Sequence, residues 1–330
     1  MISPAAENAG WKNAAGDLDS PDWSKGGIWK LAAWPGKDEI IASMRSQGLW
    51  SSTDGGATWK RMGQPGKTPA NAGQAVQFVF DPKHKNTFWT SGMYGYGVWV
   101  TNDGGASFSA LGKFTHAEGI AIDFNDPDRK TLVLGLHEQE HSLHKSSDGG
   151  VTWEKIGDKV PPGTSFTHDP IVLDAKTFIT DCAGWKKGLT SGIFRSIDAG
   201  ETWTQVSTLG PWSNPVISAK GDIFWNTLWD YPLIVSRDHG LTWEKVGGPV
   251  RGKIVELPGG RLVGLGGAQP YSSKDDGKTW TAFGDPLPFK PLGIICNDVS
   301  KTLFVWQNAK AKSPDMVMRW DFSEALLDLK

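Results

Sequence analysis

An octapeptide that recurs six times is the feature that most limits how this 330-residue chain can fold. Its pattern is Ser or Thr, any residue, Asp, any residue, Gly, any residue, Thr or Ser, and finally Trp or Phe. The copies are Ser52–Trp59, Thr101–Phe108, Ser146–Trp153, Ser196–Trp203, Ser236–Trp243 and Ser273–Trp280. Successive copies begin 37 to 50 residues apart. Repetition at this spacing is typical of propellers and solenoids, in which each repeat is one supersecondary unit.

The residues of the octapeptide suit a tight hairpin turn. Asp and Ser or Thr side chains can bond nearby backbone N–H groups and stabilise a turn. The Gly tolerates a positive φ, which other residues adopt with strain. The aromatic residue then begins the next strand and can pack inward. We therefore expect the six aspartates to be structural, although their repetition resembles a set of catalytic acids.

This octapeptide resembles the Asp-box, or BNR, repeat of sialidases, xyloglucanases, sortilin-type receptors and photosystem assembly factors. The six copies cover most of the chain. The resemblance implies a β-propeller. It does not select a function, because proteins with this repeat include both enzymes and non-enzymes.

The strand pattern predicts an all-β, seven-bladed propeller as one domain over residues 1–330. Short apolar runs punctuated by Gly, Pro and Asp indicate strands before and after each octapeptide. The predicted blades lie near residues 28–62, 74–112, 118–157, 168–206, 214–247, 253–284 and 291–322. The seventh has three strand-like runs and no octapeptide. Because Trp11–Ala14 resembles the strand that follows the first octapeptide, we expect it to complete the seventh blade and close the ring. A six-bladed ring with residues 291–322 as an appendage is the alternative.

Composition excludes several classes of protein. The formal net charge of -2 shows no excess of basic residues, so the composition does not indicate a nucleic-acid-binding protein. No apolar run reaches the ~18 residues of a membrane helix, so we expect no membrane partner. Two cysteines, Cys182 and Cys296, are too few for a disulfide framework. The first residues do not resemble a signal peptide, but a processed secreted protein would look the same. We expect a secreted or periplasmic monomer, with a cytoplasmic location as the alternative.

The loops opposite the octapeptides carry an unusual set of side chains. In a four-stranded blade, the first and third turns lie on one face, and the remaining connections lie on the other. The second face is predicted to hold His116, His137, His141, His168, Tyr94, Tyr96, Tyr231, Trp23, Trp185, Trp212 and Trp229. Aromatic rings beside imidazoles and carboxylates suit carbohydrate binding. Alternatively, the rings only fill the channel of the propeller.

Two histidines suggest an elimination reaction. His116 begins the first strand of the third blade and His137 ends the second, so antiparallel pairing should bring them together. β-Elimination on a uronic acid needs a base, an acid at the leaving oxygen and a cation for the carboxylate. A His is a suitable base near neutral pH. The pair resembles that of propeller lyases acting on ulvan and on rhamnose–glucuronate linkages, which implies Tyr94 or Tyr96 as acid and Arg45, Lys186 or Arg251 as cation.

The predicted site is therefore as follows. Catalytic candidates are His116, His137, Tyr94, Tyr96, Glu138 and Asp169. Substrate-binding candidates are Arg45, Trp23, Trp185, Lys186, His168, Trp229, Tyr231 and Arg251. The predicted function is cleavage of glycosidic bonds in a uronate-containing carbohydrate.

Two other functions remain open. A glycoside hydrolase would use a carboxylate pair drawn from Asp22, Glu118, Glu138, Asp169, Asp181 and Asp230. A non-catalytic propeller would bind or assemble other proteins. A sialidase needs three arginines that bind the carboxylate of its substrate. It is disfavoured because only Arg45 and Arg251 are assigned to the face opposite the octapeptides.

The segment His137–His141 matches the zinc-protease pattern H-E-x-x-H. That pattern requires a helix to bring its two histidines together, and we expect a strand end and loop here. No cofactor is predicted with certainty. A divalent metal ion held by residues from the set His116, His137, His141 and His168 is a further candidate.

Overall fold

The computed structural model describes residues 10–16, 18, 27–64, 69, 74–164, 166–182, 190–211, 213–227, 233–251, 254–307 and 317–323. Within these ranges the regular structure consists of strands β1 to β28 and one 3-10 turn, η3 (Gly157–Lys159). The strands form seven four-stranded antiparallel sheets, each a blade of a seven-bladed β-propeller. The predicted fold class is confirmed. Among the described residues, no helix is long and apolar enough to span a membrane.

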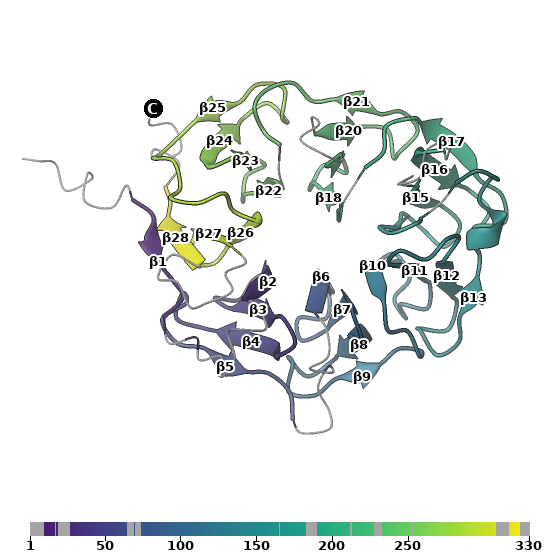
Figure 1. Cartoon of the computed structure of the whole chain (residues 1–330), viewed down its shortest axis with the longest axis horizontal. Coiled ribbons are helices and arrows are strands. Elements are labelled where there is room, and N and C mark those ends of the chain that lie inside the picture. The colour runs from purple at the N-terminus through teal and green to yellow at the C-terminus, as the bar shows by residue number, and fades with distance from the viewer. Residues whose placement is uncertain are drawn as a thin grey trace, which may run out of the picture. The chain divides into compact units, whose positions relative to one another are not determined.

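The chain divides into two compact units, Met1–Gly63 with Val246–Lys330, and Gln64–Lys245. Figure 1 labels most of their strands. The first unit holds the blades β2 (Ile28–Ala33), β3 (Ile40–Met44), β4 (Gly48–Ser52), β5 (Lys60–Arg61); β22 (Ile254–Glu256), β23 (Leu262–Gly266), β24 (Gln269–Ser273), β25 (Thr281–Ala282); and β26 (Gly293–Asn297), β27 (Thr302–Trp306), β28 (Val317–Asp321) with β1 (Lys12–Asn13).

The second unit holds four blades. They are β6 (Gln74–Phe80), β7 (Phe88–Met93), β8 (Gly97–Thr101), β9 (Ser109–Ala110); β10 (Ala117–Ile122), β11 (Leu132–Leu136), β12 (Leu143–Ser146), β13 (Glu154–Lys155); β14 (Ile171–Val172), β15 (Phe178–Cys182), β16 (Gly192–Ser196), β17 (Thr204–Ser207); and β18 (Val216–Ile217), β19 (Ile223–Trp225), β20 (Ile234–Ser236), β21 (Glu244–Lys245).

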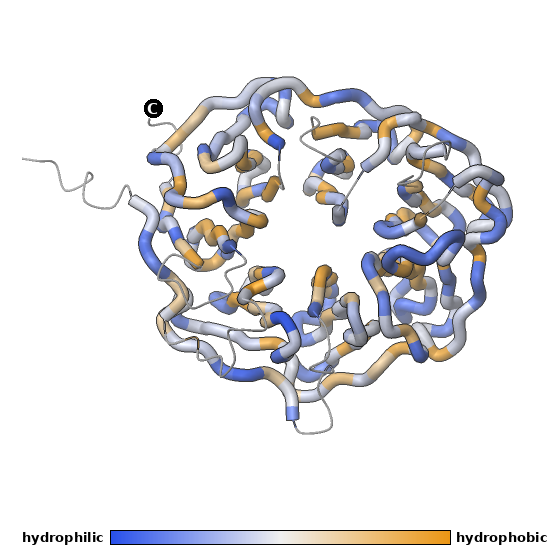
Figure 2. Tube along the Cα trace, viewed as in Figure 1, coloured by the Kyte–Doolittle hydropathy of each residue, from blue (hydrophilic) through white to orange (hydrophobic). Residues whose placement is uncertain are grey.

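Burial follows the order of strands in a blade. Every residue of the second strands β3, β7, β11 and β15 is buried, whereas both residues of the fourth strands β5, β9 and β13 are exposed. The second strands therefore need continuous apolar or small residues, as in Leu132–Leu136. In Figure 2 the hydrophobic segments, in orange, fall within the blades of each unit.

The octapeptide turn of the third blade shows the expected hydrogen bonding. The Ser146 hydroxyl accepts a bond of 2.8 Å from the N–H of Gly150 and donates one of 2.8 Å to Asp148. Asp148 also accepts bonds from the backbone N–H of Val151 and from the backbone and hydroxyl of Thr152. These bonds hold the pKa of Asp148 down at about 2. The aspartates of the other five copies have the same partners, so all six side chains stabilise turns.

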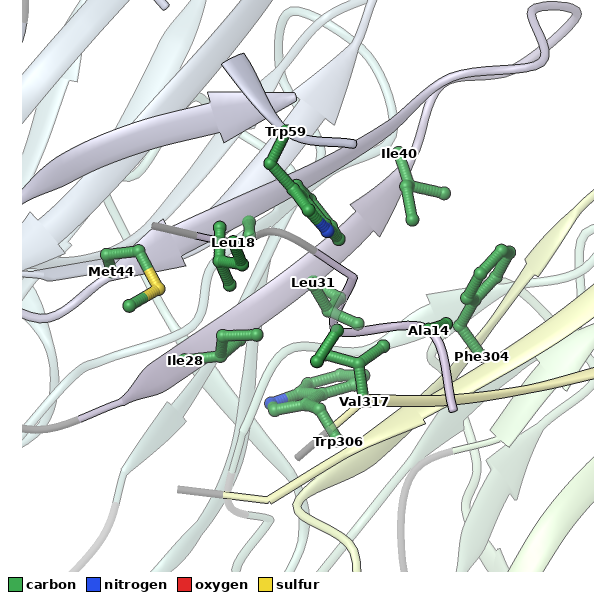
Figure 3. Packing of buried hydrophobic residues seen from close by; sticks show 12 residues of the cluster. Ala14, Leu18, Ile28, Leu31, Ile40, Met44, Trp59, Phe304, Trp306 and Val317 are labelled. Atoms are coloured by element: carbon green, nitrogen blue, oxygen red, sulfur yellow. The ribbon is translucent and has the colours of Figure 1, made fainter. Parts of the chain in front are cut away.

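The N-terminal strand completes the last blade of the first unit. Lys12 of β1 pairs with Arg319 of β28, and the next backbone bond runs 2.8 Å from the N–H of Ala14 to the carbonyl of Val317. Figure 3 shows Ala14 packed near Val317 and Phe304, with Leu18 close by in the same apolar cluster. The predicted closing strand is confirmed, and the six-bladed alternative is wrong.

Three blades of the second unit position the residues described below. Strand β10 packs against β7 of the preceding blade and against β14 of the following one. Ile120 of β10 and Trp89 of β7 belong to one buried apolar cluster. The ends of β7, β10, β11, β14 and β15 that lie away from the octapeptide turns are thereby held in fixed relation to each other.

Candidate functional site in the second unit

Two stacked imidazole rings lie at the end of the third blade. His116 precedes β10 and His137 follows β11. The N–H of His137 donates a bond of 2.8 Å to the carbonyl of His116, and Ala117 lies opposite Leu136 in the sheet. The ring centroids are 6.4 Å apart and the planes differ by 7°. The adjacency predicted from antiparallel pairing is confirmed.

Tyr94 contacts both imidazoles from the neighbouring blade. It lies in the turn between β7 and β8 with a φ of 56°, and a 2.8 Å bond from the N–H of Gly95 to the carbonyl of Thr115 ties that turn to the segment before His116. The phenol ring is 5.5 Å from the ring of His116 and 5.5 Å from that of His137, edge-on to both. Its Oη lies 3.4 Å from Nε2 of His137. Tyr94 is 49% exposed, whereas His137 beneath it is only 9% exposed.

The carboxylate of Glu118 lies beside the imidazole of His137, on the side away from Tyr94. The pairing of β10 with β11 shifts register between Ala117 and Gly119, which makes Glu118 the extra residue of a β-bulge. Its carbonyl accepts a bond of 2.7 Å from the Ser91 hydroxyl. Its Oε2 lies 2.8 Å from Nδ1 of His137. Because an ionised carboxylate only accepts hydrogen bonds, this contact favours the tautomer of neutral His137 that carries its proton on Nδ1, which makes Nε2 the acceptor on the side of Tyr94.

A second imidazole–carboxylate pair lies on the next blade. His168, which is 1% exposed, has its Nδ1 3.2 Å from Oδ2 of Asp181. The other oxygen of Asp181 accepts bonds of 2.9 Å from the backbone N–H groups of His168 and Asp169. Nε2 of His168 lies 3.9 Å from Oε2 of Glu118. At this distance the contact between His168 and Glu118 is an ion pair rather than a hydrogen bond, and it brings the second pair next to the carboxylate of the first.

Burial and neighbouring charges set the protonation of this group. Burial disfavours a charged His168, but the hydrogen bond to Asp181 and the charges of Asp181, Glu118 and Asp169 outweigh it and raise its pKa to about 9. Burial and the negative charges of Asp181 and Glu118 hold the pKa of the Asp169 carboxyl well above its ordinary value. The Asn214 amide donates a bond of 2.5 Å to Asp169. The pKa values of His168 and Asp169 are therefore both raised, and the raised pKa of His168 favours its imidazolium form at neutral pH.

Not every predicted residue joins this cluster. Tyr96 is 3% exposed, its hydroxyl faces Thr90 inside the blade, and burial raises its pKa far above the ordinary value. Glu138 is exposed, with Oε1 3.8 Å from Nε2 of His137. His168 and Asp169 were expected on an open face, but packing of the third blade against the fourth buries them.

The remaining predicted binding residues belong to the first unit or fall outside the described residues. Arg45 and Arg251 belong to the first unit, where the Arg45 guanidinium lies 6.0 Å from the ring of Trp29 and Arg251 bonds the carbonyl of Gly248 at 2.6 Å. The others are outside the described residues, and they are Trp23, Trp185, Lys186, Trp229 and Tyr231.

The structure does not place a metal centre among the described residues. No group of three or more His, Cys, Asp or Glu side chains in these ranges has the arrangement to hold an ion. Residues 137–141 form a turn with positive φ at Glu138 and His141, so the H-E-x-x-H pattern lacks the helix that a zinc protease needs.

A cavity of about 560 Å³ lies at the octapeptide side of the second and third blades. Its lining includes Asp81, Asn86 and Arg129, and it contains none of the predicted site residues.

Three residues of the cluster were not predicted as parts of it. Glu118 and Asp181 were considered only as members of a carboxylate pair, and Asn214 was not identified. No sequence pattern marked Glu118, because its direction depends on the register shift between Ala117 and Gly119.

Comparison with known proteins shows similarity to xyloglucanases and to other propellers. No protein-family model matches the chain. A xyloglucanase from Paenibacillus sp is 24% identical over 244 residues, which cover 66% of this chain and 20% of that protein. The chain thus spans about a fifth of the length of this curated relative.

Solved structures share the fold. The GH74 xyloglucanase from Xanthomonas campestris matches 94% of this chain and 55% of its own with a TM-score of 0.60 and 15% identity. YCF48 bound to D1 peptide matches 95% of this chain and 97% of its own with a TM-score of 0.61 and 15% identity. At these identities the structural matches support the propeller architecture alone. The sequence similarity shows that this chain resembles the propellers of xyloglucanases.

Proposed function

We propose that this protein is a carbohydrate-active enzyme that cleaves glycosidic bonds beside a uronate by β-elimination. The observation that carries the proposal is the 3.4 Å contact between Oη of Tyr94 and Nε2 of His137, with Glu118 on the opposite nitrogen. This arrangement places an exposed acid, Tyr94, beside a largely buried base, His137. It also gives them a direct path for exchanging a proton.

The reaction follows from these positions. Nε2 of His137 takes the proton from C5 of the uronate, the electron pair forms the C4–C5 double bond, and the C4–O bond breaks. The leaving oxygen takes the phenolic proton of Tyr94. The imidazolium of His137 then returns its proton to the Tyr94 phenolate across the same contact, so no water is consumed. Glu118 stabilises the positive charge that forms on His137.

His116 is the group that we assign to the substrate carboxylate. It is partly exposed, and its ring is parallel to that of His137 at 6.4 Å. A protonated His116 would neutralise the carboxylate and thereby acidify the C5 proton. Lys186, which is outside the described residues, remains a proposal for the same role.

A product assay tests this function. The purified chain is incubated with ulvan, and an unsaturated uronate product raises the ultraviolet absorbance. We expect His137→Ala to abolish this rise. Because the His137 side chain is buried and bonded to Glu118, thermal unfolding is measured to show that the variant is folded at the assay temperature. The matched control is His239→Ala, since His239 lies in an octapeptide turn of the fifth blade. Retained activity in His137→Ala would contradict the assignment.

Glycoside hydrolysis is a second candidate, favoured by the 24% identity to a xyloglucanase. It would use two carboxylates, with Glu138 exposed and Glu118 partly buried near His137. Xyloglucan is the test substrate. New reducing ends without a rise in ultraviolet absorbance would replace elimination by hydrolysis. No turnover of either glycan would favour a binding or assembly protein.

We retain as a prediction that the protein is a monomer and is secreted or periplasmic.

A further inference from the structure

One oxygen of Glu118 faces imidazoles from two blades. Oε2 lies 2.8 Å from Nδ1 of His137 in its own blade and 3.9 Å from Nε2 of His168 in the next. The proposed reaction uses the first contact only. The second contact comes from a side chain that is 1% exposed and therefore does not meet a substrate.

His168 is fixed on three sides. Asp181 holds its ring nitrogen at 3.2 Å and its backbone N–H at 2.9 Å. The ring of Phe166 stacks on it with centroids 5.7 Å apart and planes 29° apart. Because both Asp181 and His168 are buried and held by backbone bonds, Nε2 of His168 has a fixed direction toward Glu118.

The charges agree with this geometry. Three carboxyl groups, Glu118, Asp169 and Asp181, surround His168, and the bond to Asp181 together with their charges raises the pKa of the imidazole to about 9. A buried carboxylate without a compensating cation would be costly. The imidazolium compensates Glu118 and Asp181 together, while leaving Glu118 as the acceptor for His137.

We infer that His168 and Asp181 are positioning residues, which hold Glu118 against Nδ1 of His137 and so fix the tautomer that directs Nε2 toward Tyr94. Removing this support frees the carboxylate to rotate, and His137 then populates both neutral tautomers. The catalytic consequence rests on the proposed function. The tautomer of His137 does not, because it is a property of the protein without substrate.

The first experiment measures the imidazole nitrogens directly. The full chain is labelled with ¹⁵N-histidine, and the signals of His137 among the seven histidines are assigned by their loss in His137→Gln. We expect the neutral ring of His137 in the native protein to carry its proton on Nδ1. In His168→Gln and in Asp181→Asn we expect a mixture of the two tautomers. The matched control His239→Gln should leave the His137 signals unchanged.

Two results would overturn the inference. One is a native His137 protonated on Nε2. The other is an unchanged Nδ1–H tautomer in a folded His168→Gln protein. If that variant does not fold, Asp181→Asn decides, because its amide oxygen can still accept from the backbone N–H groups of His168 and Asp169. An unchanged His137 tautomer in folded Asp181→Asn would then overturn it.

Kinetics separate this inference from the proposed function. On ulvan we expect His168→Gln to lower kcat by about 10–100-fold with little change in KM, by analogy with the effect of outer-shell partners of catalytic groups. If the native protein turns over no glycan while the tautomer behaves as expected, the proposed function fails and the positioning role stands. If the native enzyme is active and His168→Gln keeps both its kcat and its tautomer, only the positioning role fails.

Discussion

Oε2 of Glu118 lies 2.8 Å from Nδ1 of His137, and the contact joins a β-bulge in one strand to the end of the neighbouring strand. A regular β10 would alternate its side chains without interruption from His116 onward. The extra residue changes this alternation and re-aims Glu118. Since the Ser91 hydroxyl bonds the bulge carbonyl, the preceding blade holds the carboxylate in place.

Glu118→Gln should therefore impair catalysis more than stability. The amide can bond Nδ1 as donor or acceptor, so it no longer imposes one tautomer or stabilises the imidazolium. We expect kcat on the active substrate to fall about 10²–10⁴-fold, approaching the effect of the equivalent change in a Ser-His-Asp triad. Steady-state kcat and KM measure it. Glu244→Gln in β21 is the control, since that side chain is 67% exposed. A fall of less than about threefold would refute this role for Glu118.

Ser146→Ala should destabilise the third blade. The buried hydroxyl accepts the bond from Gly150, so its removal leaves a buried N–H without that partner. We expect a loss of about 1–3 kcal/mol in the free energy of unfolding. Urea unfolding measures it. Ser147→Ala, at the exposed neighbouring position, should stay within about 0.5 kcal/mol of the native protein. Equal effects of the two substitutions would show that the hydroxyl does not organise the turn.

Gly16→Ala should weaken the closing segment. Gly16 has a φ of 47°, and a Cβ there would overlap the backbone carbonyls of Gly56 and Ala57. Gly36 is a matched control, because its φ of 70° is also positive but nothing lies within 4 Å of its added Cβ. Backbone strain costs each variant about 1–2 kcal/mol. We expect Gly16→Ala to lose a further ~1–3 kcal/mol from steric overlap, as measured by urea unfolding. Equal losses would mean that the segment adjusts freely.

The fold could be predicted because the residues that form each turn are close together in the sequence and recur in six of the seven blades. Each octapeptide contains both the acceptors and the N–H groups that close its own turn, as Ser146 and Gly150 show. The pairing of His116 with His137 was equally predictable, because it depends only on adjacent antiparallel strands.

The depth of the site could not be predicted in the same way. The burial of His168 and Asp169 depends on packing between blades, which the pattern within a blade does not specify. Tyr94 and Tyr96 are two residues apart, yet the turn conformation of Tyr94 leaves it exposed and Tyr96 enters the blade. The partners of Glu118 depend on a bulge that the strand pattern does not reveal.

A buried ion pair between Asp81 and Arg129 makes the stability of the fold depend on pH. Asp81, after β6, has a fully buried carboxylate that accepts bonds of 2.8 Å and 2.9 Å from Nε and Nη2 of Arg129 in the next blade. Burial alone would raise the pKa of Asp81, but the bonds from Arg129 and from the backbone of His84 and Lys83 outweigh it and hold the pKa well below the ordinary value.

The sign of the pH effect follows from this depressed pKa. Asp81 is ionised in the folded protein down to a lower pH than the ~3.9 of an unfolded chain. Its contribution to stability is therefore complete above about pH 5 and is lost as the pH falls through 3.9 toward the folded pKa. Asp81→Asn leaves the Arg129 guanidinium buried without its counter-ion, so we expect a loss of about 3–5 kcal/mol at pH 7. The difference in the free energy of unfolding between Asp81→Asn and the native protein should become smaller below pH 4. Urea unfolding between pH 7 and 3 measures it, with the exposed Asp128→Asn as control. A gap that stays constant over this range would show that the Asp81 charge does not stabilise the fold.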